Sequence, residues 1–348
     1  MFLVNNKTSI FFITKGLFMV PFVCLFCSFD IYKTPDEQKH TLTGLAQGTS
    51  YNISYYSTNE KVEKSAIDSI LAVIDSSMSL YKPYSLINKF NNSEQGVEID
   101  ENFRIVLKKS LQVYDDTQGI FDITIAPLVQ AWGFGVKEID DYPTPGTIET
   151  IKKCIGSNLL KLHGAHLIKA KPCVKIDMNG IAQGYTVDLV ADYLLGRGIT
   201  QFVVEIGGEL RINGTKPDGT LMHIGIEGPA NDNQAPEIRH IVGLKSGAIT
   251  TSGNYRKFRQ NGSKKITHLI DPRTGYPLEN NLISVTLYAN KAITADGYDN
   301  AIMAMDIKKA LDFVETHHEL EAYIIYHNEE GKVVDTMTTG FRKLLIDE

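Results

Sequence analysis

The chain is short of cysteine and has no excess of basic residues, and these two absences exclude several classes of protein. Its 348 residues include four cysteines, and no spacing among them is that of a zinc site. The formal net charge of −6 supplies no basic field of the kind that attracts nucleic acid, so we expect no nucleic-acid partner. The sequence also lacks internal repeats, which argues against a solenoid protein.

Acidic side chains are missing from the first 29 residues. This stretch contains the apolar run 16–27, which is short for a membrane span and has the length of a signal-peptide core. We therefore expect residues 1–29 to be a signal peptide or a lipoprotein signal, with a buried helix or an uncleaved anchor as the alternatives. Cys27 could carry a lipid that attaches the chain to a membrane, although Phe26 is larger than the residue that usually precedes such a cysteine.

Cys154 and Cys173 are the two cysteines that remain beyond the export signal. In an oxidising compartment they could form one disulfide. We slightly favour the alternative, which is two buried free thiols.

The rest of the sequence reads as a polar tether over residues 30–41 and one domain over residues 42–348, since no linker divides the latter. Periodicity predicts helices over residues 60–77, 101–117, 147–155, 183–195, 295–305 and 307–317. It predicts strands over residues 50–57, 202–206, 210–213, 223–227, 241–244, 283–288, 322–327 and 333–336. Because helices and strands are mixed without regular βαβ alternation, we assign the chain to the α+β class.

A glycine-rich segment over residues 177–185 joins an extended stretch to a helix. At such a junction the backbone can approach a ligand closely, and the helix N-terminus offers free N–H groups to an anion. Asp177 cannot bind a phosphate directly, but it could accept hydrogen bonds from a purine amino group or a hydroxyl. An ordinary first helical turn is the alternative.

A second polar segment begins the helix predicted over residues 295–305. Asp296 and Asn300 lie four residues apart and share a face, and Asp299 lies three residues from Asp296. Closely placed oxygen ligands of this kind suit Mg²⁺ held partly by protein and partly by phosphate. Capping of the helix by Asp296 is the alternative.

The turn over residues 267–277 places His268, Asp271 and Arg273 around Pro272 and Gly275. Proline fixes its own φ, and glycine supplies positive φ where the chain needs it, so the turn can present polar side chains at the edge of a cleft. Arg273 could neutralise phosphate charge or serve the turn alone.

Two aromatic residues have competing interpretations. Tyr81 follows the first long helix and could stack on a planar ring, or it could belong to an ordinary polar turn. Trp132 is the only tryptophan, and we expect it to anchor the core.

Taken together and in order, over roughly residues 44–305, these segments resemble the ApbE-type flavin transferases, also named FAD:protein FMN transferases. The matching segments are Gly44-x-Ala46-Gln47-Gly48-Thr49-x-Tyr51, Tyr81/Ser85/Asn88, Phe121-Asp122-x-Thr124-x-x-Pro127-Leu128, Asp177 to Tyr185, Glu205 to Gly208, Thr251-Ser252-Gly253-Asn254-Tyr255, Thr267 to Gly275, and Ala295-Asp296. The resemblance implies a single α+β domain related to T-fold enzymes, with mixed sheets, flanking helices, FAD in a cleft and Mg²⁺ near its pyrophosphate.

The activity that the resemblance implies is transfer of FMN from FAD to a Thr hydroxyl of a target protein, with release of AMP. The targets are subunits of membrane redox complexes that act outside the cytoplasm. This agrees with an exported chain that is periplasmic, or anchored on the periplasmic side of the inner membrane.

The resemblance also implies the roles of individual residues. The positions that match FAD contacts are Gln47, where many members have Met, and Tyr81, Ile120, Phe121, Asp122, Asp177, Gln183 and Ile270. The positions that match metal ligands are Asp296, the carbonyl of Gly180, and Asn300 in place of the usual Thr, with Asp299 as an added carboxylate. His268 is the candidate catalytic base for the acceptor hydroxyl because its free pKa suits a base at neutral pH, and Asp296 is the second catalytic residue.

Two other functions would use the same residues. A metal-dependent FAD pyrophosphatase would release FMN and AMP to water and would need poorer exclusion of water from the site. A flavin-binding lipoprotein that stores FAD without turnover would need neither a base nor a metal.

Overall fold

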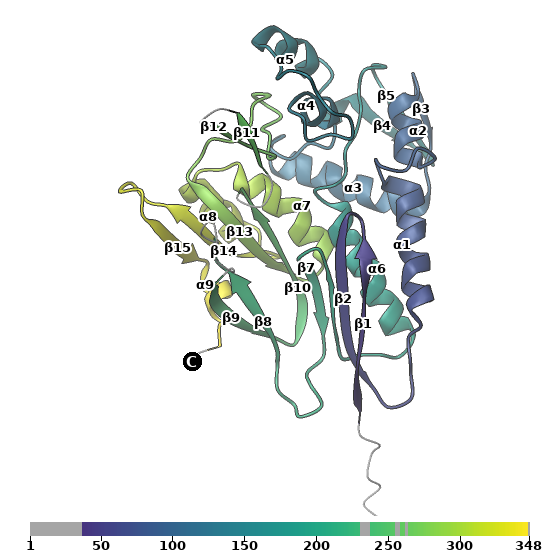
Figure 1. Ribbon diagram of the computed structural model, residues 1–348, viewed down its shortest axis with the longest axis vertical. Coiled ribbons are helices and arrows are strands. Elements are labelled where there is room, and N and C mark those ends of the chain that lie inside the picture. The colour runs from purple at the N-terminus through teal and green to yellow at the C-terminus, as the bar shows by residue number, and fades with distance from the viewer. Residues whose placement is uncertain (1–36, 230–236, 255–257, 262–263, 347–348) are drawn as a thin grey trace, which may run out of the picture. The chain divides into compact units, whose positions relative to one another are not determined.

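An antiparallel sheet of eight strands forms the centre of the region that the structure describes, residues 37–229, 237–254, 258–261 and 264–346 (Figure 1). This computed structural model orders the strands β1-β2-β6-β7-β10-β13-β14-β15. Their bounds are β1 Gln38–Ala46, β2 Thr49–Ser57, β6 Phe202–Ile206, β7 Glu209–Asn213, β10 Ser246–Gly253, β13 Leu282–Ala289, β14 Glu321–His327 and β15 Val333–Met337.

Three smaller sheets surround the central one. They are the three-stranded sheet β3-β5-β4 and the hairpins β8–β9 and β11–β12. Their bounds are β3 Gly96–Glu98, β4 Leu160–His163, β5 His166–Lys169, β8 Met222–Glu227, β9 Ile238–Leu244, β11 Phe258–Asn261 and β12 Lys264–Thr267.

Helices cover the sheet and build the end of the molecule that holds the predicted site. Their bounds are α1 Lys64–Met78, α2 Leu86–Asn92, α3 Glu101–Asp116, α4 Ala126–Ala131, α5 Pro145–Lys152, α6 Ala182–Gly196, α7 Ala292–Met303, α8 Ile307–Thr316 and α9 Thr339–Arg342, with a 3-10 turn at Ser157–Leu159. The structure confirms the α+β class. None of the described helices is long and apolar enough to cross a membrane.

The two faces of the central sheet are buried by different elements. On one face α6 and α7 pack against the strands, and nearly every residue of α7 is buried. The predicted alternation over β2 holds, since Tyr51, Ile53 and Tyr55 are buried together with residues of α6. On the other face β8, β9 and α9 pack around Tyr323 and Phe341. Because both of its faces are covered, the central sheet forms a packed layer on which α6 and α7 lie.

Several predicted boundaries need correction. The tether predicted over residues 30–41 is too long, because β1 begins at Gln38 and belongs to the domain, whereas residues 1–36 lie outside the described part of the chain. Helix α7 begins at residue 292 rather than 295, because a side chain from α6 caps its first N–H groups. Strand β10 was not predicted, because all of its residues except Ile249 are small or hydroxylated and most of them are buried, so no alternating pattern results.

The prediction of two free thiols is wrong. Cys154 and Cys173 form a disulfide, with a Cα–Cα distance of 5.7 Å. The bond joins the end of α5 to the extended segment that leads to Asp177. Neither cysteine is fully buried, which removes the assumption on which the prediction rested.

Candidate active site

A cavity of about 350 Å³ lies between the helices that cover the sheet and the loops at their ends. Its lining includes twelve residues predicted from the sequence: Tyr81, Ile120, Phe121, Asp122, Asp177, Gly180, Gln183, His268, Ile270, Asp296, Asp299 and Asn300. These residues come from segments that are far apart in the sequence. The structure therefore brings almost the whole predicted site into one cavity.

Gln47 is the predicted site residue that does not line this cavity. It lies in the turn between β1 and β2 with a φ of 52°, and its side-chain amide donates a 2.7 Å hydrogen bond to the hydroxyl of Thr186. The turn and this bond hold the side chain against α6. Its contact with a bound nucleotide stays a prediction.

Asp296 and Asp299 form a buried acidic pair on α7. Asp296 accepts a 2.7 Å hydrogen bond from the backbone N–H of Gly184, and Asp299 accepts a 2.8 Å bond from the hydroxyl of Thr250. The other carboxylate oxygen of Asp299 is buried and has no hydrogen-bond partner. Such an oxygen is costly to leave unpaired and is therefore available to a cation.

The environment of this pair disfavours negative charge. Burial raises the pKa of Asp296 to about 7, and the charge of Asp188 adds to the effect, while the bond from Gly184 opposes it. Burial also raises the pKa of Asp299 well above its ordinary value, and the neighbouring Asp296 raises it further. Strongly raised carboxylate pKa values in a cavity are typical of functional sites.

The remaining predicted metal ligands lie beside the acidic pair. The side-chain oxygen of Asn300 accepts a 2.8 Å bond from Ser252, and its amide nitrogen lies 3.5 Å from the carbonyl oxygen of Gly180. Within the described residues no three His, Cys, Asp or Glu side chains gather as a metal cluster. The available donors are therefore two carboxylates, one amide and one backbone carbonyl, an all-oxygen set that fits Mg²⁺ shared with phosphates.

Another part of the cavity lining contains residues predicted to contact FAD. Phe121 is buried, whereas Tyr81 is 64% exposed. Asp122 is buried and binds Thr124 and Ser157 through backbone and hydroxyl groups, so its carboxylate shapes this wall. Burial raises its pKa, although those hydrogen bonds oppose the effect.

Asp177 differs from Asp122 because it is partly exposed to the cavity. One of its oxygens accepts a 2.8 Å hydrogen bond from the backbone N–H of Asn179, and its other oxygen has no bond to a described group. Desolvation raises its pKa. A partly exposed acceptor fits the predicted contact with an amino group or a hydroxyl.

The turn over residues 267–277 carries His268 to the cavity. Asp271 closes the turn by accepting bonds from the backbone N–H and guanidinium of Arg273, and Gly275 takes a φ of 83°. Burial raises the pKa of Asp271, but the bonds and charge of Arg273 outweigh it and lower the value overall. Arg273 does not line the cavity, so its structural interpretation fits the geometry better.

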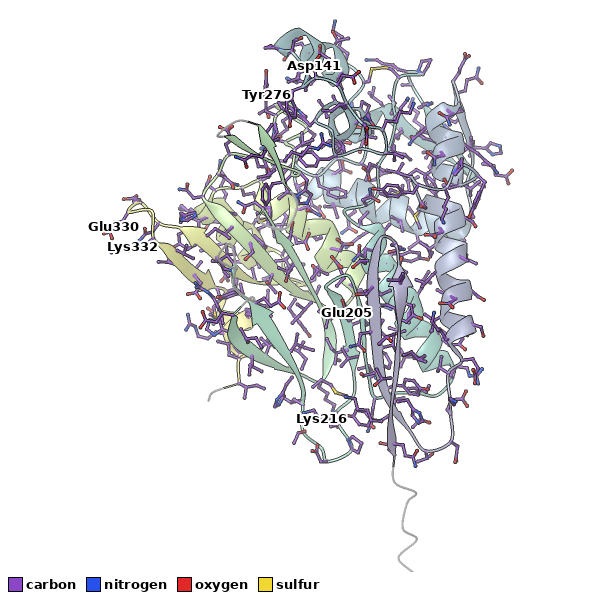
Figure 2. The ribbon with its side chains drawn as sticks, viewed as in Figure 1. Asp141, Glu205, Lys216, Tyr276, Glu330 and Lys332 are labelled. Carbon is purple, nitrogen blue, oxygen red and sulfur yellow. A yellow bond between two sulfur atoms is a disulfide. The ribbon has the colours of Figure 1, made fainter. Side chains whose placement is uncertain are left out.

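Trp132 connects this turn to α4. Its indole N–H donates a 2.8 Å bond to the carbonyl of Gly275, and its ring lies 6.0 Å from that of Tyr276. Figure 2 places Tyr276 near Asp141, at the end of the molecule where α4 and α5 lie. Trp132 is thus an anchor, as expected, but it anchors the wall of the site rather than the central core. Phe134, two residues later, makes a T-shaped contact with the His268 ring, with 6.3 Å between the ring centroids.

Several residues that line the cavity have no site role predicted from the sequence. Glu209 lies at the start of β7 and contacts the amide of Gln183, which also donates a 2.8 Å bond to the carbonyl of Ile206. Thr251 and Ser252 also line the cavity. The two-glycine turn before Glu209 was a usable signal, because it lets β7 begin directly at the cavity edge.

Comparison with known proteins gives consistent results. The sequence profile of the ApbE family matches residues 47–324. A FAD:protein FMN transferase from Vibrio cholerae is 33% identical over 304 residues, 85% of this chain and 90% of that protein. One from Haemophilus influenzae is 33% identical over 318 residues, 87% of this chain and 91% of that protein.

Solved structures are similar as well. The flavin transferase ApbE from Vibrio cholerae superposes with a TM-score of 0.80 at 32% identity, over 89% of this chain and all of that chain. The apo form of the Pseudomonas stutzeri flavinyl transferase ApbE gives a TM-score of 0.80 at 31% identity, over 89% of this chain and 97% of that chain.

Proposed function

The chain belongs to the ApbE family, and on that premise we propose that it transfers FMN from FAD to a Thr hydroxyl of a target protein and releases AMP. The observation that carries this proposal is the single cavity in which His268, the acidic pair Asp296/Asp299 and the predicted FAD contacts meet. A base, a cluster of oxygen donors and an aromatic wall are the groups that a pyrophosphate exchange of this kind requires.

The chain's own residues divide the work of the reaction. Tyr81 and Phe121 bind the planar parts of the substrate, and the partly exposed carboxylate of Asp177 accepts hydrogen bonds from it. The acceptor oxygen attacks the phosphorus of the FMN half, the bond from that phosphorus to the bridging oxygen breaks, and the bridging oxygen leaves with AMP. His268 takes the hydroxyl proton, and its ring makes a T-shaped contact with the ring of Phe134.

Mg²⁺ fits the donor set beside the acidic pair, where Asp296, Asp299, Asn300 and the carbonyl of Gly180 would hold it. When bound, it would neutralise pyrophosphate charge and stabilise the leaving AMP as a Lewis acid. The unpaired buried oxygen of Asp299 supports this assignment.

We also propose that the chain is exported and acts on the periplasmic side of the inner membrane, on subunits of membrane redox complexes. The Cys154–Cys173 disulfide supports an oxidising compartment. The predicted signal and the predicted lipidation site, Cys27, lie outside the described residues. Fractionation of cells that carry a tagged chain tests the proposal, and recovery from the cytosol alone, with Met1 retained, would contradict it.

Replacement of the base tests the mechanism. We expect His268→Ala to lower the rate of transfer to a Thr-containing target peptide by roughly 10²–10⁴-fold, the range for a positioned proton acceptor. FAD affinity should change little, because a base acts mainly in the transition state. The two quantities are measured separately, by rate at saturating FAD and by flavin fluorescence titration. A variant that binds FAD weakly and regains its rate at saturating FAD would show that His268 binds the substrate instead.

A further inference from the structure

Helix α6 contacts the beginning of α7 through three residues that are spaced four positions apart, Gly184, Asp188 and Asp192. The backbone N–H of Gly184 donates a hydrogen bond to Asp296. Asp188 accepts hydrogen bonds from the backbone N–H groups of residues 292 and 293. Asp192 accepts hydrogen bonds of 3.0 and 3.1 Å from the side chain of Lys291. Positions i, i+4 and i+8 of a helix share one face. One face of α6 therefore contacts α7 from its N-cap to Asp296.

Asp188 is the central contact of this face and is only 4% exposed. One of its oxygens accepts a 2.5 Å bond from Arg211 and a 3.1 Å bond from the N–H of Ala292, and the other accepts a 3.0 Å bond from the N–H of Ile293. Lys291, the N-cap residue of α7, makes no capping bond with its own side chain. Asp188 therefore caps α7 from a different helix, a task that the N-cap residue normally performs.

The capped turn is directly connected to the acidic pair. Asp296 lies one helical turn beyond residue 292, and Asp299 follows in the next turn. Both carboxylates are buried, and because both residues belong to α7, a shift of the helix backbone moves both of them. Asn300 lies on the same helix, so the position of the first turn of α7 consequently sets where all three side chains lie relative to the carbonyl of Gly180.

We propose that Asp188 is a positioning residue for the reaction, which sets the Mg²⁺ affinity of the site by fixing the start of α7. This inference rests on the metal assignment in the proposed function. Metal sites tolerate little displacement of their ligands, and supporting residues around them are worth roughly 10–100-fold in metal affinity. The competing role is purely structural, in which the Asp188–Arg211 ion pair only ties α6 to the sheet.

The test compares two capping carboxylates in the full chain. Asp188→Ala and Asp306→Ala each remove a carboxylate that caps a helix, but Asp306 caps α8, which contributes nothing to the cavity. Mg²⁺ binding to the metal-free chain is measured by titration calorimetry, next to FAD affinity and urea stability. We expect Asp188→Ala to weaken Mg²⁺ binding by roughly 10–100-fold and Asp306→Ala to leave it unchanged, although both lower stability.

A second variant covers the case in which Asp188→Ala does not fold. Asp188→Glu keeps the charge opposite Arg211 but moves the carboxylate by one methylene, so it should also weaken Mg²⁺ binding. In either variant a saturating Mg²⁺ concentration should restore most of the transfer rate under conditions in which the metal-free variant is already folded in the urea profile, so that the recovery reflects metal affinity and not Mg²⁺-linked refolding. Wild-type Mg²⁺ affinity in a folded Asp188 variant would overturn the inference alone. Failure of the wild-type chain to bind Mg²⁺ would overturn the metal assignment and this inference together.

Discussion

At the scale of residues, the acidic pair Asp296/Asp299 makes the metal-free site electrostatically unfavourable. In the folded chain the pKa of Asp296 is raised to about 7 and that of Asp299 is raised well above its ordinary value, whereas the unfolded chain loses these protons near pH 4. Between these two values the folded state binds more protons, so the pair makes stability fall as pH rises. Bound Mg²⁺ would favour the charged carboxylates and so would oppose this loss of stability with rising pH, as expected of a metal site.

Urea unfolding of the metal-free chain at several pH values between 4 and 7 tests this charge balance. We expect the free energy of unfolding of the wild type to fall more steeply with pH than that of Asp296→Asn, because the variant lacks one titration and relieves the repulsion on Asp299. The difference between the two profiles removes the contribution of carboxyls elsewhere in the chain. One of these is Asp271, whose lowered pKa makes stability change with pH in the opposite direction. Parallel pH profiles would contradict the assignment.

At the scale of elements, the close approach of α6 and α7 depends on Gly184. A Cβ at this position would lie 2.5 Å from the carbonyl oxygen of Ala292 and 2.7 Å from the Cβ of Asp296, closer than packed atoms allow. We expect Gly184→Ala to lower the free energy of unfolding by about 1–3 kcal/mol, the cost of overpacking, and to weaken Mg²⁺ binding. Urea titration and calorimetry measure the two effects.

Gly196→Ala is the matched control, because this glycine ends the same helix and a Cβ there meets nothing within 4 Å. This substitution should change the free energy of unfolding by no more than about 1 kcal/mol, and it should leave Mg²⁺ affinity unchanged. Equal behaviour of the two alanine variants would mean that α6 and α7 do not need their close packing.

The disulfide between Cys154 and Cys173 also holds separate elements together. It joins the segment before Ser157, which binds Asp122, to the segment before Asp177. We expect the double variant Cys154→Ser/Cys173→Ser to lose about 2–4 kcal/mol of stability and to bind FAD more weakly, since the two segments hold Asp122 and Asp177 at the cavity. Urea unfolding and FAD titration of the reduced wild type should reproduce both effects. Unchanged FAD affinity in the variant and in the reduced chain would show that the bond serves stability alone.

At the scale of the whole molecule, the sequence was informative where one helix or strand explains its own pattern. The periodicity over residues 101–117 and the alternation of Tyr51, Ile53 and Tyr55 each predicted an element correctly, because one buried face determines the pattern. Strand β10 is buried without such a pattern, and the start of α7 depends on Asp188, more than a hundred residues away in the sequence. Such long-range causes leave no local signal.

The candidate site followed the same rule. Its motifs could be located one by one, because tight turns and helix starts require particular residues. Their convergence came from the family resemblance and not from spacing. The disulfide and the role of Trp132 as a support for the His268 turn depend on contacts between distant segments, so the sequence alone could not reveal them.

The stoichiometry of the products tests the central claim most directly. The full chain is incubated with FAD, Mg²⁺ and a Thr-containing target peptide, and AMP, free FMN and flavinylated peptide are quantified by mass spectrometry. Transfer predicts one flavinylated peptide for each AMP released, no free FMN, and no modification of a peptide in which the Thr is replaced by Ala. Free FMN equal to AMP with an unmodified peptide would contradict the account and identify a pyrophosphatase, and intact FAD would contradict any catalytic role.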